Sequence, residues 1–215
     1  MNQVRPGSRR GTDPIEPPPA TPERAFACAA VILAAGFGRR FGSDKRQWRM
    51  PDGRTLLEST LARYQNGFES IFLVLRPEDG DWARGLGGCT KVFAAGAHLG
   101  MGHSLTAGIA AARGFDGAFV ALGDMPWVEA STLETLRRGL NDRSAIVRPV
   151  HDGTPGHPVG FGQAHFDALM NLSGDQGAKA VLDQNPQSII NVEVADAGLI
   201  RDLDAPPSAA ARYPP

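Results

Sequence analysis

A glycine-rich segment with three cations is the first part of this 215-residue sequence that could do chemistry. It runs from Leu33 to Lys45 and reads LAAGFGRRFGSDK. Its glycines allow a tight turn that points backbone N–H groups at an anion. Arg39, Arg40 and Lys45 supply positive charge for a triphosphate and for a departing pyrophosphate, since both guanidinium and ammonium groups bind phosphate oxygens. The segment is therefore a candidate nucleotide-binding loop.

Spacing excludes two well-known phosphate loops at this segment. A Walker A loop requires G-x-x-x-x-G-K-[ST], but Ser43 and Asp44 separate Gly42 from Lys45. The dinucleotide fingerprint G-x-G-x-x-G would need glycine where Phe41 stands. Taken by itself, the segment also fits an ordinary turn between a strand and a helix, with solvated arginines.

A carboxylate follows another apolar run, in the segment LGDMP that contains Asp124. This position places Asp124 at the carboxyl end of a predicted strand, where ligands of parallel sheets lie. A carboxylate there can hold Mg²⁺, which usually binds one or two carboxylates together with substrate phosphates. The alternative is that Asp124 caps the following turn.

Several later segments carry polar residues in turn-prone sequence. Ser104, in GMGHSL, could bond a ligand or act as a helix N-cap. The segments PGHPV and GDQGAK read as substrate-side loops, and His157 there is either a base or a structural imidazole. Asp202 and Asp204, in DLDAP, are solvated tail charges unless they serve a site.

The elements that must position these residues alternate between strands and helices. Apolar runs predict strands over 28–35, 71–75, 91–93, 117–122, 145–150 and 188–194. Between them, the pattern predicts helices from residue 55 onward and over 104–113, 131–140, 164–172 and 178–184. Thr55 with Glu58, and Ser131 with Glu134, have the spacing of capping boxes. This alternation predicts a mainly parallel sheet.

Composition frames one domain between proline-rich ends, since ten of the 17 prolines lie within 1–22 and 206–215. We expect a disordered N-terminal arm over 1–26, one domain over 27–206 and a flexible tail over 207–215. A net charge of −1 argues against a nucleic-acid partner. No apolar run reaches membrane-spanning length, and the two cysteines are too few for a disulfide framework, so we expect a cytoplasmic protein.

Taken together, the segments resemble a known family. LAAGFGRRFGSDK is similar to the L-A-A-G-x-G-x-R-M-G-x-x-K signature of the MobA-like nucleotidyltransferases. GMGHSL, LGDMP, PGHPV, GDQGAK and DLDAP resemble, in the same order, segments of its molybdenum cofactor cytidylyltransferase branch. The resemblance covers about Val31 to Pro206. It implies a single-domain, three-layer α/β/α architecture: a Rossmann-like, glycosyltransferase-A-type fold with a mainly parallel sheet.

The resemblance also implies a reaction, in which the phosphate of molybdopterin attacks the α-phosphate of CTP and pyrophosphate leaves. Mg²⁺ is the implied cofactor, and a molybdenum hydroxylase is the implied client enzyme. The implied catalytic residues are Arg40, Lys45 and Asp124. The implied nucleotide-binding residues are Leu33, Ala34, Ala35, Gly36, Gly38, Arg39, Arg40, Lys45 and Ser104. The implied metal ligands are Asp124 with Asp204 or Asp202, and the implied substrate-binding residues are Gly156, His157, Pro158, Asp175 and Lys179.

The sequence departs from the family pattern at three places. Phe41 replaces a methionine of similar bulk, for which we expect little effect, and Ala205 replaces a threonine beside Asp204. The segment 46–50, RQWRM, is more cationic and aromatic than usual, which favours a different acceptor. The alternatives are therefore a sugar or alcohol phosphate as acceptor, GTP as donor, a non-catalytic cofactor-binding chaperone, or an NAD(P)-dependent oxidoreductase.

Overall fold

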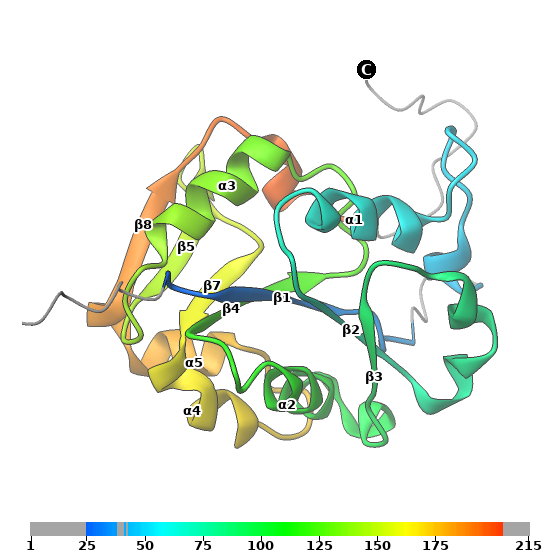
Figure 1. Ribbon diagram of the computed structural model, residues 1–215, viewed down its shortest axis with the longest axis horizontal. Coiled ribbons are helices and arrows are strands. Elements are labelled where there is room, and N and C mark those ends of the chain that lie inside the picture. Colours follow the sequence, from blue (N-terminus) through cyan, green and yellow to red (C-terminus); the bar gives the residue numbers. More distant parts are fainter. Residues whose placement is uncertain (1–24, 38–40, 42, 204–215) are drawn as a thin grey trace, which may run out of the picture.

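Strands and helices alternate along the chain in the computed structural model, which describes residues 25–37, 41 and 43–203 (Figure 1). The predictions for Gly38, Arg39, Arg40 and Asp204 lie outside the described residues, as do residues 1–24 of the predicted arm over 1–26 and the chain end. The domain boundaries therefore stay predictions.

The described strands form one eight-stranded sheet. They are β1 (Cys28–Leu33), β2 (Ile71–Leu75), β3 (Thr90–Phe93), β4 (Gly117–Leu122), β5 (Ile146–His151), β6 (Thr154–Pro155), β7 (Val159–Gly162) and β8 (Ile189–Glu193). The spatial order is β3-β2-β1-β4-β7-β5-β6, and β8 pairs with β5. The pairs β1–β2, β1–β4, β2–β3 and β5–β8 are parallel, whereas β7 is antiparallel to both of its neighbours. The prediction of a mainly parallel sheet is confirmed.

Helices cover both faces of this sheet (Figure 1). On one face lie α1 (Leu56–Gln65) and α3 (Ala130–Gly139), and on the other α2 (Met101–Ala111), α4 (Phe166–Met170) and α5 (Lys179–Gln184). Short 3-10 turns lie between them: η1 (Lys45–Gln47), η2 (Pro77–Gly80), η3 (Trp82–Gly85), η4 (Ala97–Leu99), η5 (Gln163–His165), η6 (Pro186–Ser188) and η7 (Ala197–Ile200). The three-layer architecture is confirmed. Within the described ranges, every helix is too short or too polar to cross a bilayer.

The central strands are buried on both faces, which explains their continuous apolar sequence. In β1, Ala30 and Ile32 pack into the core beneath α1 and α3. The alternate residues Ala29 and Val31 pack into the core on the α2 side. Because side chains of a strand alternate between faces, a run without polar residues is what a doubly covered strand requires.

Of the two predicted capping boxes, one is confirmed and one is wrong. The Thr55 side chain accepts from the backbone N–H of Glu58 at 3.2 Å, and Glu58 accepts from that of Thr55 at 2.6 Å. The helix α3, in contrast, has Glu129 as its N-cap residue, so Ser131 is already helical. Its hydroxyl instead donates to the Glu129 carboxylate at 3.2 Å.

The sheet also contains β7, a strand where the sequence predicts a substrate loop. The four residues of β7 include two glycines, which lower strand propensity and hide the pattern. Gly160 lies against the Phe119 ring, where a Cβ would be 2.5 Å from the nearest ring carbon. Glycine therefore serves here to let the ring of β4 pack against the neighbouring strand.

Candidate active site

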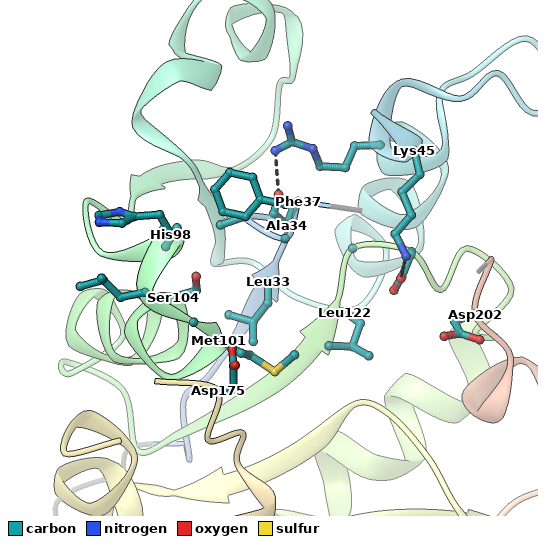
Figure 2. A pocket seen from close by; sticks show the side chains of 18 residues that line it. Leu33, Ala34, Phe37, Lys45, His98, Met101, Ser104, Leu122, Asp175 and Asp202 are labelled. Atoms are coloured by element: carbon teal, nitrogen blue, oxygen red, sulfur yellow. Dashed lines mark hydrogen bonds and ion pairs between the residues drawn. The ribbon is translucent and has the colours of Figure 1, made fainter. Parts of the chain in front are cut away.

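A cavity of about 590 Å³ opens at the carboxyl ends of β1 and β4. Its lining comes from the chain after β1, the turn η1, the start of α2 and the chain after β4. The lining residues are Leu33, Ala34, Ala35, Gly36, Phe37, Lys45, Arg46, Ala97, His98, Leu99, Gly100, Met101, Ser104, Leu122, Gly123, Asp124, Asp175 and Asp202. Figure 2 shows Lys45 and Asp202 on one side, His98, Ser104 and Met101 on the other, and Leu33 and Leu122 between them.

The start of the glycine-rich segment forms one wall of the cavity. Leu33, Ala34, Ala35 and Gly36, all predicted to bind nucleotide, line it. The N–H of Ala34 donates to the Val74 carbonyl at 2.9 Å, which continues the pairing of β1 with β2. This bond fixes the exit of the chain from the sheet, so the glycine-rich backbone begins at a defined edge.

Lys45 and Asp124 form an ion pair in the cavity, although 79 residues separate them in sequence. The Asp44 carboxylate caps η1 by accepting from the Arg46 N–H at 3.2 Å, and Lys45 is the first residue of that turn. Next to Asp124, the N–H of Gly123 donates to the Leu33 carbonyl at 3.0 Å. Since α3 begins only at Ala130, Asp124 does not cap a helix.

A further cavity carboxylate, Asp202, comes from the far end of the described chain. The N–H of Leu203 donates to the Asp124 carbonyl at 3.3 Å, which brings this segment to the site. The Leu203 side chain packs in a small buried cluster with Phe41 and Leu56. Within the described residues no group of three or more His, Cys, Asp or Glu side chains is placed to hold a metal ion, although Asp124, Asp175 and Asp202 all line the cavity.

The first turn of α2 forms the opposite wall. The N-cap residue Gly100 has φ 126° and ψ 171°, and the helix begins at Met101. Ser104 is therefore already helical, so of the two alternatives for this residue the N-cap is wrong. The N–H of Gly102 donates to the Gly174 carbonyl at 2.9 Å, and this contact places the following residue, Asp175, on the cavity wall.

The other predicted substrate-binding residues, Gly156, His157, Pro158 and Lys179, are not among the lining residues. The His157 N–H donates to the Leu199 carbonyl at 2.8 Å. The imidazole is partly buried, and this desolvation lowers its pKa, which favours the neutral form. Its Nδ1 has no hydrogen-bond partner within the described part of the chain. Substrate binding by these four residues stays a prediction.

Several lining residues were missed by the sequence reasoning. They are Phe37, Arg46, Ala97, His98, Leu99, Met101 and Leu122. Phe37 and Met101 lie inside segments that the sequence did single out, so a wider reading of those segments could have included them. His98 and Leu99 belong to η4, a turn with no sequence signal of its own.

Solved structures share this architecture. The homologue of Mycobacterium tuberculosis Rv0371c from Mycobacterium sp. strain JC1 matches with a TM-score of 0.73 and 26% identity, over 85% of this chain and 92% of that one. Rv0371c from M. tuberculosis H37Rv, in complex with manganese, matches with a TM-score of 0.65 and 26% identity, over 78% and 88% of the two chains. The fold is that of the Rossmann-like nucleotidyltransferases, as predicted.

The family follows from the sequence match. Residues 30–189 match the MobA-like NTP transferase domain, and the chain belongs to that family of nucleotidyltransferases. Among curated relatives, the bifunctional protein GlmU of Rhodopseudomonas palustris strain BisB5 is 30% identical over 178 residues. The match covers 79% of this chain but only 37% of that protein, so the chain spans about a third of its relative.

Proposed function

We propose that the protein transfers a CMP group from CTP to the phosphate of molybdopterin and releases pyrophosphate, with Mg²⁺ as cofactor. The observation that carries this proposal is the ion pair of Lys45 with Asp124 inside the cavity. The resemblance implies that Lys45 binds phosphate and that Asp124 binds the metal. These two residues come from distant parts of the sequence and meet at the ends of β1 and β4.

The proposed step needs little acid–base chemistry. An oxygen of the molybdopterin phosphate, already ionised, forms a bond to the α-phosphorus of CTP. The bond from that phosphorus to the bridging oxygen breaks, and the electron pair leaves with pyrophosphate. Catalysis therefore rests on alignment and on neutralising negative charge, as in other phosphoryl-transfer enzymes. When CTP binds, the Lys45 ammonium would leave the Asp124 carboxylate and pair with the triphosphate instead.

We assign Asp124 and Asp202, two of the three aspartates that line the cavity, to a magnesium ion. Mg²⁺ usually binds one or two carboxylates and completes its shell with water and substrate phosphates. Asp124 and Asp202 line the same cavity, and the hydrogen bond from Leu203 to Asp124 ties their segments together. When bound, the ion would neutralise phosphate charge. Asp204 stays the other predicted ligand.

The remaining walls suit the nucleoside and the acceptor. The positive end of the α2 dipole lies at the cavity through Gly100, Met101 and Ser104, and it favours a bound anion. Leu33 and Leu122 form an apolar floor between the polar sides (Figure 2). Ser104, buried in the first turn of α2, is the proposed contact to the nucleotide on this side.

Sugar phosphates and alcohol phosphates are the alternative acceptors to molybdopterin. The match to bifunctional GlmU proteins supports acceptors other than molybdopterin within the nucleotidyltransferase family. A sugar phosphate or an alcohol phosphate would use the same cavity chemistry, since each offers an ionised phosphate oxygen as nucleophile. GTP is the alternative donor.

The decisive experiment is an assay of pyrophosphate release with Mg²⁺. CTP and GTP are each combined with molybdopterin, a sugar phosphate or an alcohol phosphate, and the wild type is compared with Asp124→Asn. We expect turnover with CTP and molybdopterin, and a loss of at least about a hundredfold in the variant. Asp167→Asn is the matched control, because its carboxylate is exposed, pairs with Arg113 at 3.0 Å and does not line the cavity.

Two results would refute this function. Tight binding of molybdopterin without turnover of any acceptor would identify a non-catalytic chaperone. In a thermal-shift measurement, stabilisation by NADPH but not by CTP with Mg²⁺ would identify a dinucleotide-binding protein. Turnover with a sugar phosphate instead would keep the enzyme class and correct the acceptor.

A further inference from the structure

A charge network starts at Arg46, the residue after Lys45, which lines the cavity, and continues behind the cavity wall. Arg46 is only 4% exposed although it is charged. Its Nη1 donates to the Ala34 carbonyl at 2.8 Å, its Nη2 to Asp79 Oδ1 at 2.8 Å and its Nε to Asp44 Oδ1 at 2.8 Å. All sides of the planar guanidinium are thus used within the protein, which is the kind of site where arginine cannot be exchanged for lysine.

The second part of the network, farther from the cavity, surrounds the buried Asp79 in the turn η2 after β2. Asp79 accepts from the backbone N–H of Arg76 at 2.9 Å and from the Trp82 indole N–H at 3.1 Å. Arg76 also donates to Asp44 at 3.3 Å, and the Trp82 ring lies 5.0 Å from the Arg46 guanidinium carbon. Arg46 and Arg76 face the carboxylates of Asp44 and Asp79, and Arg76 also pairs with the exposed Glu78 at 3.5 Å, so both arginines have carboxylate partners within the protein.

The network holds the chain on both sides of Lys45. The Asp44 carboxylate accepts from both the backbone and the side chain of Arg46, which fixes the turn that contains Lys45. The Lys45 side chain reaches away from the network to Asp124. At Ala34, the N–H is bound to β2 and the carbonyl to Arg46; the dashed line at Ala34 in Figure 2 marks the latter bond.

We propose that Arg46 is a positioning residue for nucleotide binding: it locks Ala34 and the turn η1 to the end of β2, and so aims Lys45 into the cavity. This inference rests on the proposed function. The sequence of the segment 46–50 favours a different acceptor. The inference instead gives Arg46, the first residue of this segment, a role in binding the nucleotide. Removing one partner of a buried ion pair leaves the other charge unpaired. A substitution at Asp79 should therefore also disturb Arg46.

The test uses titration calorimetry of the full chain with CTP and Mg²⁺, well below the lowest melting temperature of the variants. Arg46→Lys keeps the charge but lacks the fork, and Asp79→Asn disturbs the network from a residue that does not line the cavity. We expect both variants to raise the Kd for CTP by about tenfold or more. Arg49→Lys is the matched control, since Arg49 is exposed and donates to the Gly53 carbonyl, and we expect it to bind like the wild type.

Calorimetry separates positioning from lost folding. Misfolded protein lowers the binding stoichiometry, whereas a displaced Lys45 raises Kd at full stoichiometry. If Arg46 acts through Lys45, then Arg46→Lys added to Lys45→Ala should weaken CTP binding much less than it does in the wild type.

Three outcomes would overturn the inference. Wild-type affinity in Asp79→Asn with weak binding in Arg46→Lys would mean that Arg46 contacts the ligand directly. Additive effects of the Lys45 and Arg46 substitutions would mean that Arg46 does not act through Lys45. If the wild type binds no nucleoside triphosphate, the proposed function fails, and this inference fails with it; only the first two results reject positioning while leaving the proposed function intact.

Discussion

Gly100→Ala is the substitution whose effect the structure defines most sharply. Gly100 has φ 126° and ψ 171°, a backbone region that essentially only glycine occupies. A Cβ built there would lie 2.2 Å from both the carbonyl carbon and the carbonyl oxygen of Gly174. The alanine must therefore adopt a strained backbone and also push the loop that carries Asp175 away from α2.

The expected cost combines these two effects. The unfavourable backbone region costs about 1–3 kcal/mol, and forcing an extra carbon into packed structure costs about 1–3 kcal/mol. A combined loss of about 4 kcal/mol would lower the melting temperature of a chain of this size by about 8–16 °C. Because Gly100 and Asp175 line the cavity, we also expect the affinity for CTP with Mg²⁺ to fall by at least about tenfold.

Gly114→Ala is the matched control, since a Cβ there meets no heavy atom within 4 Å and its φ lies outside the left-handed range. Its melting temperature should stay within about 2 °C of the wild type. Differential scanning calorimetry and titration calorimetry measure the two quantities. If Gly100→Ala melts and binds CTP like the Gly114→Ala protein, the contact between α2 and the Gly174 loop is not as described, and the reasoning fails.

Three further predictions test the fold: one for Gly108, one for the cap of α1 and one for the two thiols. Gly108→Ala should destabilise by about 1–3 kcal/mol in urea unfolding, because its Cβ would lie 2.4 and 2.8 Å from valine side chains of β1 and β2; unchanged stability would place α2 further from the sheet. Thr55→Ala should cost about 1 kcal/mol. Hydrogen bonds from Thr55 lower the pKa of Glu58 below 4.5, so their stabilisation is complete above that pH and is lost as the pH falls through the lowered value; a Glu58→Gln protein with the same acid dependence of unfolding would contradict this. Partial burial raises the pKa of Cys28 to about 11 and also raises that of Cys89, so both thiols should alkylate slowly at neutral pH; rates equal to those of the denatured chain would refute this partial burial.

The sequence predicts the central strands best, because burial on both faces leaves a strong pattern. The expected bounds of the second and fourth strands, 71–75 and 117–122, agree with β2 and β4. The helix α2 was expected from residue 104 but begins at Met101. Its first turn contains Gly102, which contributes little to a helix pattern, and its N-cap residue has no capping side chain.

Antiparallel pairing is harder to predict, as the segment before α4 demonstrates. The sequence around PGHPV has the prolines and glycines of a loop, and its assignment as a strand depends on what lies beside it. Val159 and Gly160 pair with β4 on one side, and Gly160 and Phe161 pair with β5 on the other. Such partners are distant in sequence, so local propensity cannot reveal them.

The same limit applies to the adjacent cations Lys45 and Arg46, which a sequence presents as one basic pair. The structure separates them through partners on opposite sides of the turn: Lys45 meets Asp124, which is 79 residues away, and Arg46 meets Asp79, which is 33 residues away. One carboxylate stands at the cavity and the other behind its wall, because Asp124 follows β4 whereas Asp79 follows β2. Strand order thus decides that the charge of Lys45 faces the site and that the charge of Arg46 is balanced within the protein. A basic residue in a glycine-rich loop can therefore be assigned to phosphate binding only once the strands that bring its partner are known.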